Sequence, residues 1–160
     1  DALRVKTTPM KLANMRETMM FEFDSISANT TKVVLSWESL AVPFTVNVGD
    51  INARMIGVIR NEVKNRKADD VRALNQGAGF VFSNKMKEHY EEAISWLDES
   101  IKVKETFGNL NSKARLLAEM GKKADAIATA EKAIQLGKAA TPAANTAGLE
   151  AEVQKWKGSK

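Results

Sequence analysis

The hydrophobic periodicity of this chain changes once, at Gly49-Asp50, and this change limits the folds that the chain can adopt. Before it, apolar residues alternate with polar ones, as at Val33, Leu35 and Trp37, which is typical of half-buried strands. After it, apolar residues recur every three or four positions, which is typical of amphipathic helices. The chain therefore belongs to the α+β class, with a β-strand unit over residues 1–48 and a helical region over residues 49–160.

The β-strand unit is predicted to be a short antiparallel sheet. Alternation places strands at 3–6, 19–24, 33–38 and 42–48, with a turn at 25–31. Trp37 is expected to be a core anchor beside a solvated Glu38. The apolar face of so few strands needs a cover. Since the chain begins at Asp1 without an initiator Met, we expect a processed protein or a fragment, in which preceding strands or another chain complete the sheet.

The helical region is predicted to hold six helices. Asp50 is a plausible N-cap for the first, and Gly121 and Gly137 are expected to end the fourth and fifth. The segment that starts at Tyr90 can be aligned with the segment that starts at Lys123, so that Ala93 matches Ala126. The spacing between these two alanines is 33 residues, close to the period of about 34 residues in tetratricopeptide repeats. The alternative is an antiparallel stack of helical hairpins with coincidental spacing.

Small residues on the helices make the repeat prediction specific. Small side chains let neighbouring helices approach closely. We therefore expect buried helix–helix contacts at four alanines of the complete repeat: Ala114, Ala126, Ala130 and Ala133.

The residue types present argue against catalysis. The chain has no cysteine and one histidine, His89, which excludes thiolate catalysis, disulfides and cysteine-held metal sites. Gly77-Ala78-Gly79 follows a helical pattern and lacks the remainder of a nucleotide fingerprint. Adjacent acidic pairs such as Glu91-Glu92 do not face one point on a helix. We expect no enzyme activity, no catalytic or metal-binding residue and no cofactor.

The charge pattern does not favour nucleic acid or membrane as a partner. The net charge is +4, and the densest basic stretch, residues 60–72, has no interleaved aromatic residue. No apolar run approaches the roughly 20 residues of a membrane span.

Several strand motifs resemble a known family. Ala2-Leu3-Arg4-Val5-Lys6, Met20-Phe21-Glu22-Phe23-Asp24 and Val34-Leu35-Ser36-Trp37-Glu38 are similar to the closing strands of Domain of Unknown Function 2911. The resemblance implies a bacterial protein that is periplasmic or otherwise exported and has a tetratricopeptide-like tail. It also implies that a β-rich stretch precedes Asp1. No site residue and no activity are transferred by it.

The favoured function is protein or peptide binding by the helical array. The candidate residues lie on the first helix of the complete repeat: Asn109, Asn111, Lys113 and Arg115. A competing hypothesis is an exported enzyme or carbohydrate-binding protein whose site lies mainly in other residues. A third is a purely structural tail that stabilises the β unit.

Overall fold

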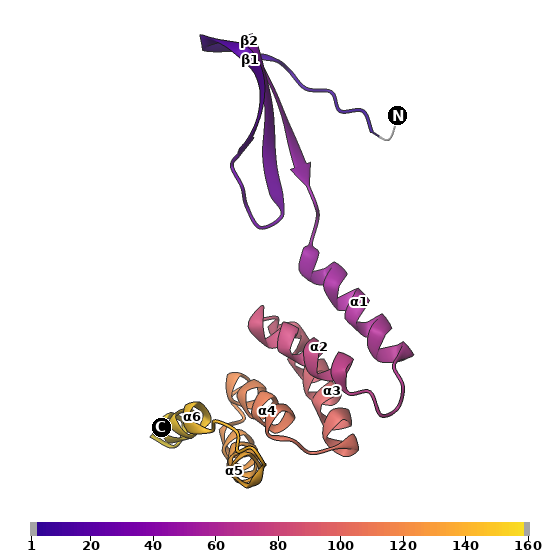
Figure 1. Cartoon of the computed structure of the whole chain (residues 1–160), viewed down its shortest axis with the longest axis vertical. Coiled ribbons are helices and arrows are strands. Elements are labelled where there is room, and N and C mark those ends of the chain that lie inside the picture. The colour runs from indigo at the N-terminus through magenta and orange to yellow at the C-terminus, as the bar shows by residue number, and fades with distance from the viewer. Residues whose placement is uncertain (1–2, 159–160) are drawn as a thin grey trace. The chain divides into compact units, whose positions relative to one another are not determined.

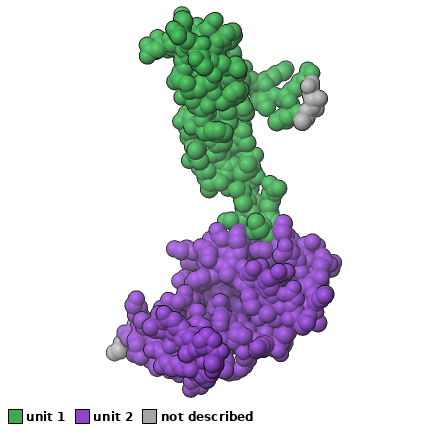
Figure 2. All heavy atoms as spheres, viewed as in Figure 1, with its two compact units in different colours: residues 1–55 green, residues 56–160 purple. Residues whose placement is uncertain are grey.

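A computed structural model describes residues 3–158 and confirms the α+β class. Two strands come first, followed by the helices (Figure 1). The chain divides into two compact units, residues 1–55 and residues 56–160 (Figure 2).

The first unit contains an antiparallel pair of strands, β1 (Met10–Asp24) and β2 (Thr30–Asn47). Phe21 pairs with Leu35 and Phe23 with Val33. Residues 3–9 have no regular structure, so the prediction of a strand at 3–6 is wrong. The lack of a backbone N–H at Pro9 is consistent with a ladder that starts only at Met10. The two strands predicted at 33–38 and 42–48 belong to one continuous strand, β2.

Strand β2 bends back on itself. A straight strand of its length would span roughly 60 Å at about 3.3 Å per residue. However, the Val48 amide donates to the Asn29 carbonyl at 2.9 Å, so the two ends of β2 meet. Near its middle, Glu38 has a φ of 51°, and the register with β1 shifts on both sides of the Arg16–Glu38 pair. The ribbon in Figure 1 shows this reversal.

One face of the β unit is apolar and exposed. Phe21, Phe23 and Trp37 are 61%, 70% and 55% exposed. The prediction that Trp37 is a core anchor is therefore wrong. The physical reason is that the described part of this sheet has only two strands, which cannot enclose a core without a second layer.

The helices follow the predicted order with small differences at their ends. Their bounds are α1 (Ile51–Asn65), α2 (Arg72–Ser83), the 3₁₀ turn η1 (Lys87–His89), α3 (Tyr90–Val103), α4 (Phe107–Glu119), α5 (Lys123–Ala139) and α6 (Ala147–Gly158).

Two of the three predicted helix-end signals are confirmed. Asp50 Oδ1 accepts from the Ala53 amide at 3.0 Å, and Gly121, with a φ of 77°, follows the end of α4. Gly137 does not end α5, which continues to Ala139. It instead allows close packing, since a Cβ there would lie 2.8 Å from Thr146 Cγ2.

The helical unit is built around two hydrophobic clusters. The first joins α1, α2 and α3 and includes Ile56, Leu74 and Leu97. The second joins α4, α5 and α6 and includes Leu110 and Leu149. The four alanines Ala114, Ala126, Ala130 and Ala133 are fully buried, as the small-residue pattern predicts. These contacts let the helices pack closely and determine which helix faces remain exposed.

Candidate functional site

A groove of about 300 Å³ crosses three helices of the second unit. Its lining comes from one end of α2, the middle and end of α4, and the last turns of α6. We call it the α2–α4–α6 groove, and it is lined by Phe82, Arg115, Ala118, Glu119, Glu152 and Trp156. Two aromatic rings beside a few charged groups form the composition that is usual in binding sites of proteins.

An ion pair crosses the groove. Arg115 Nη2 lies 3.1 Å from Glu152 Oε1, so it joins α4 to α6. The Nε atom of Arg115 is buried and has no hydrogen-bond partner among the described residues. A buried donor without a partner costs free energy.

Glu119 carries a charge that the groove does not offset. Among residues 3–158, no ion pair or hydrogen bond reaches its carboxylate, and its side chain is exposed. The negative charge of Glu119 also affects Tyr90. Burial raises the pKa of the Tyr90 phenol, and the Glu119 carboxylate raises this pKa further. Because Arg115 is already paired with Glu152, the groove retains one uncompensated negative charge.

The four residues predicted on α4 separate into two pairs. Asn111 and Arg115 are one turn apart and therefore share a helix face, and Arg115 lines the groove. The Oδ1 atom of Asn111 is buried and has no partner in the described part of the chain. Arg115 lines the groove, whereas Asn111 does not.

Asn109 and Lys113 are instead used within the fold. Asn109 is buried and forms a capping box with Thr106 at the start of α4. Its Nδ2 also donates to Ser100 Oγ at 3.1 Å and to the Lys104 carbonyl at 2.9 Å. Lys113 Nζ binds Asp98 Oδ1 at 2.5 Å, joining α4 to α3. Neither residue lines the groove.

Sequence reasoning missed five groove residues: Phe82, Ala118, Glu119, Glu152 and Trp156. Phe82 and Trp156 appear in the apolar stripes of α2 and α6, so the sequence pattern assigns them to the core. They are partly buried against the two clusters and line the groove as well. No spacing rule connects them, because they lie on helices that are far apart in the sequence.

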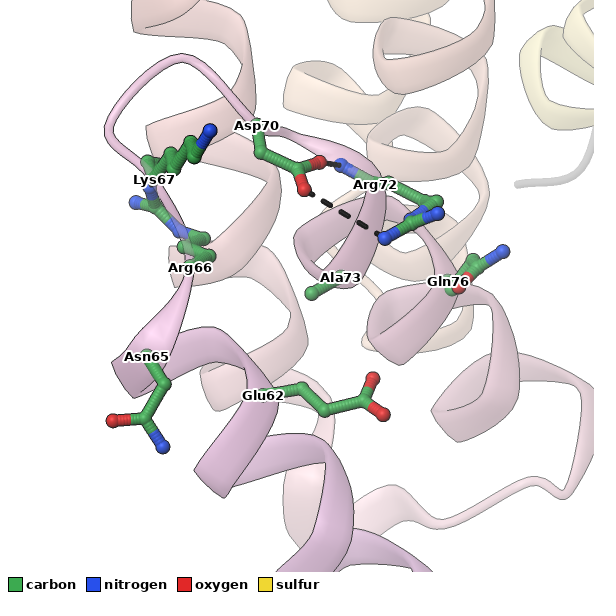
Figure 3. A pocket seen from close by; sticks show the side chains of 8 residues that line it. All are labelled: Glu62, Asn65, Arg66, Lys67, Asp70, Arg72, Ala73 and Gln76. Atoms are coloured by element: carbon green, nitrogen blue, oxygen red, sulfur yellow. Dashed lines mark hydrogen bonds and ion pairs between the residues drawn. The ribbon is translucent and has the colours of Figure 1, made fainter.

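A larger hollow, of about 620 Å³, lies where α1 connects to α2 (Figure 3). Its lining is polar and contains no aromatic residue. Asp70 Oδ1 accepts from the Arg72 amide at 2.9 Å, and Arg66 donates to the carbonyls of Lys67 and Ala68. Arg66 also reaches Glu99 Oε2 at 2.5 Å. These contacts hold the connection itself, so the hollow is a weaker candidate than the α2–α4–α6 groove.

The single histidine belongs to a surface ion-pair cluster. Glu92 accepts from Arg60 Nε and Nη2, both at 2.8 Å, and lies 3.4 Å from His89 Nδ1. The hydrogen bonds from Arg60 lower the pKa of Glu92. This cluster joins α1 to α3. The Ser95 hydroxyl donates to the Glu92 backbone carbonyl at 2.7 Å.

Residues 3–158 contain no group of three or more acidic or histidine side chains arranged to hold a metal ion. None of the described helices is long and apolar enough to cross a membrane.

Comparison with known proteins gives no match to any family model, curated protein or solved structure.

Proposed function

We propose that the helical unit is a non-catalytic module that binds an extended segment of another protein in the α2–α4–α6 groove. The observation that carries the proposal is the composition of this groove. Two aromatic side chains, Phe82 and Trp156, flank an Arg115–Glu152 pair. Aromatic residues and arginine are the side chains most often responsible for binding energy at protein interfaces.

The β unit supports a second contact with protein. Its apolar face, with Phe21, Phe23 and Trp37 exposed, is suited to further strands of the same protein or to another chain. The family resemblance favours further strands and an exported, bacterial protein. A contribution of these strands to an enzyme or carbohydrate site is the competing hypothesis.

The groove can be tested by filling it. Ala118 is partly buried in the groove lining, so Ala118→Trp would occupy the space without removing a native contact. Random linear peptides selected on the immobilised chain should bind the wild type and lose binding to Ala118→Trp. The matched control is Ala124→Trp, which adds the same side chain at an exposed position of α5.

Binding is measured by fluorescence anisotropy, with circular dichroism to verify that both variants are folded. Selection of no peptide would contradict the proposal. So would equal affinity of selected peptides for the wild type and a folded Ala118→Trp variant.

A further inference from the structure

We infer that the α2–α4–α6 groove selects peptides by a basic side chain, a lysine or an arginine, bound between Glu119 and the aromatic rings. This inference rests on the proposed peptide-binding function and specifies the chemistry of the ligand. It depends on charge complementarity, on the aromatic lining and on the position of the single arginine in the groove.

The charges of the groove exclude an acidic side chain as the favoured ligand group. Its lining contains two carboxylates, Glu119 and Glu152, and one guanidinium, Arg115. The guanidinium is 3.1 Å from the Glu152 carboxylate, so its charge is already offset. Glu119 has no ion-pair partner among residues 3–158. An acidic side chain entering the groove would therefore meet an unpaired like charge.

The aromatic rings favour a cation for a second reason. Phe82 from α2 and Trp156 from α6 both line the space that Glu119 borders. The face of an aromatic ring attracts an ammonium or guanidinium group, and tryptophan does so most strongly. A cation in this space would gain from the ring faces and from Glu119 together. A neutral apolar side chain would gain from the rings alone.

The groove is also large enough for such a side chain and small enough to be specific. Its volume of about 300 Å³ is at the lower end of ligand pockets, which are roughly 300–1,000 Å³. One long side chain with its flanking backbone fits this space better than a helix or a folded domain. The occupant is therefore a linear segment with one basic anchor.

The experiment begins with peptides selected from a random linear library on the wild-type chain. We expect the enriched sequences to share a lysine or arginine. Replacing that residue by norleucine, which keeps the aliphatic stem, should raise the dissociation constant by about tenfold or more, as expected for a partly desolvated cation near a ring and a carboxylate. Exchanging lysine and arginine in the same peptide shows which cation is preferred.

Variants of the protein give the second measurement. Glu119→Gln should weaken binding of the basic peptides several-fold, and Glu119→Lys should shift the enriched sequences toward acidic residues. The matched control is Glu88→Gln, which neutralises an exposed glutamate outside the groove and should leave the affinity unchanged.

The outcomes separate this inference from the proposed function. Peptides that lose binding to Ala118→Trp but lack a basic residue, or that bind Glu119→Gln as tightly as the wild type, would overturn the inference and leave the proposed function standing. Failure to select any peptide would overturn both.

Discussion

Gly137 lies inside α5, at the point where this helix passes the start of α4 and the connection to α6. A Cβ atom here would lie 2.8 Å from Thr146 Cγ2 and 3.0 Å from Phe107 Cδ2. Sequence reasoning assigned this glycine to the end of a helix, because glycine is common there. Its real role is to permit contact between segments distant in the sequence, which a local pattern cannot reveal.

We expect Gly137→Ala to destabilise the helical unit by about 1–3 kcal/mol, because overpacking outweighs the better helix propensity of alanine. The free energy of unfolding can be measured by urea denaturation. Gly79→Ala is the matched control, since no atom lies within 4 Å of its added Cβ, and it should leave the stability unchanged or raise it. A Gly137→Ala variant as stable as the wild type would contradict the packing role.

The Arg60–Glu92 pair predicts a pH dependence of stability. The hydrogen bonds from Arg60 hold the pKa of Glu92 below its ordinary value of 4.5. A group whose pKa is lowered on folding stabilises the fold above its unfolded pKa, and this stabilisation is lost as the pH falls through the folded pKa. The loss therefore occurs below about pH 4.5.

The magnitude of this loss is at most about 1 kcal/mol, because Arg60 is half exposed and solvent screens the pair. Urea denaturation between neutral and acid pH should show a smaller acid-induced loss for Glu92→Gln than for the wild type. Glu62→Gln is the control, since Glu62 has no ion pair among the described residues. Identical pH profiles for Glu92→Gln and the wild type would show that the pair does not contribute.

At the scale of elements, the helices could be predicted well because their signals are local. Period 3.6, the Asp50 cap and Gly121 place most helix ends within a few residues of those observed. The capping box of Thr106 and Asn109 also had a local signal, a threonine three residues before an amide side chain. That signal indicates a structural role for Asn109, which sequence reasoning had selected as a binding residue.

The strands and the groove could not be predicted to the same degree. Alternation gives the face of each residue, but it does not reveal that β2 reverses near Glu38 or that no layer covers Trp37. The groove depends on the packing of α2, α4 and α6, which is set by contacts between residues far apart in the chain. Only Arg115 belonged to both the predicted and the observed site.

The buried alanines make a prediction for the contact between α4 and α5. Ala130 is fully buried in the second cluster, so Ala130→Leu should force the helices apart and cost about 1–3 kcal/mol. Thermal unfolding followed by circular dichroism measures the loss. Ala128→Leu on the exposed side of α5 is the control and should change stability little. An unchanged melting temperature for Ala130→Leu would contradict close packing at this contact.

At the scale of the molecule, the two hydrophobic clusters lie wholly within residues 56–160. The helical unit therefore has its own core, whereas the β unit exposes its largest side chains. We expect a chain starting at Gly49, which retains the Asp50 cap of α1, to fold as a soluble helical monomer. Light scattering and circular dichroism measure this. Aggregation of the shortened chain would show that the helices depend on the β unit.

The 160-residue chain also contains the exposed apolar strand face, so its association should differ from that of the chain starting at Gly49. We expect it to self-associate or to aggregate, since exposed strand edges and apolar faces promote association. Replacing Phe21 and Phe23 together by threonine should reduce this association and preserve strand propensity. Light scattering of a well-behaved monomer at high concentration, with the native phenylalanines, would contradict the need for a cover.

The exposed strand β1 also determines how the chain would respond to peroxide. The protein has seven methionines and no cysteine, so thioether sulfur is its only readily oxidised sulfur. Met15 and Met19 are 70% and 59% exposed on β1, whereas Met86 in the helical core is 6% exposed. Sulfoxide formation would begin on the strand and make its side chains polar. An oxidant could therefore change the association of the β unit while the helical core stays intact.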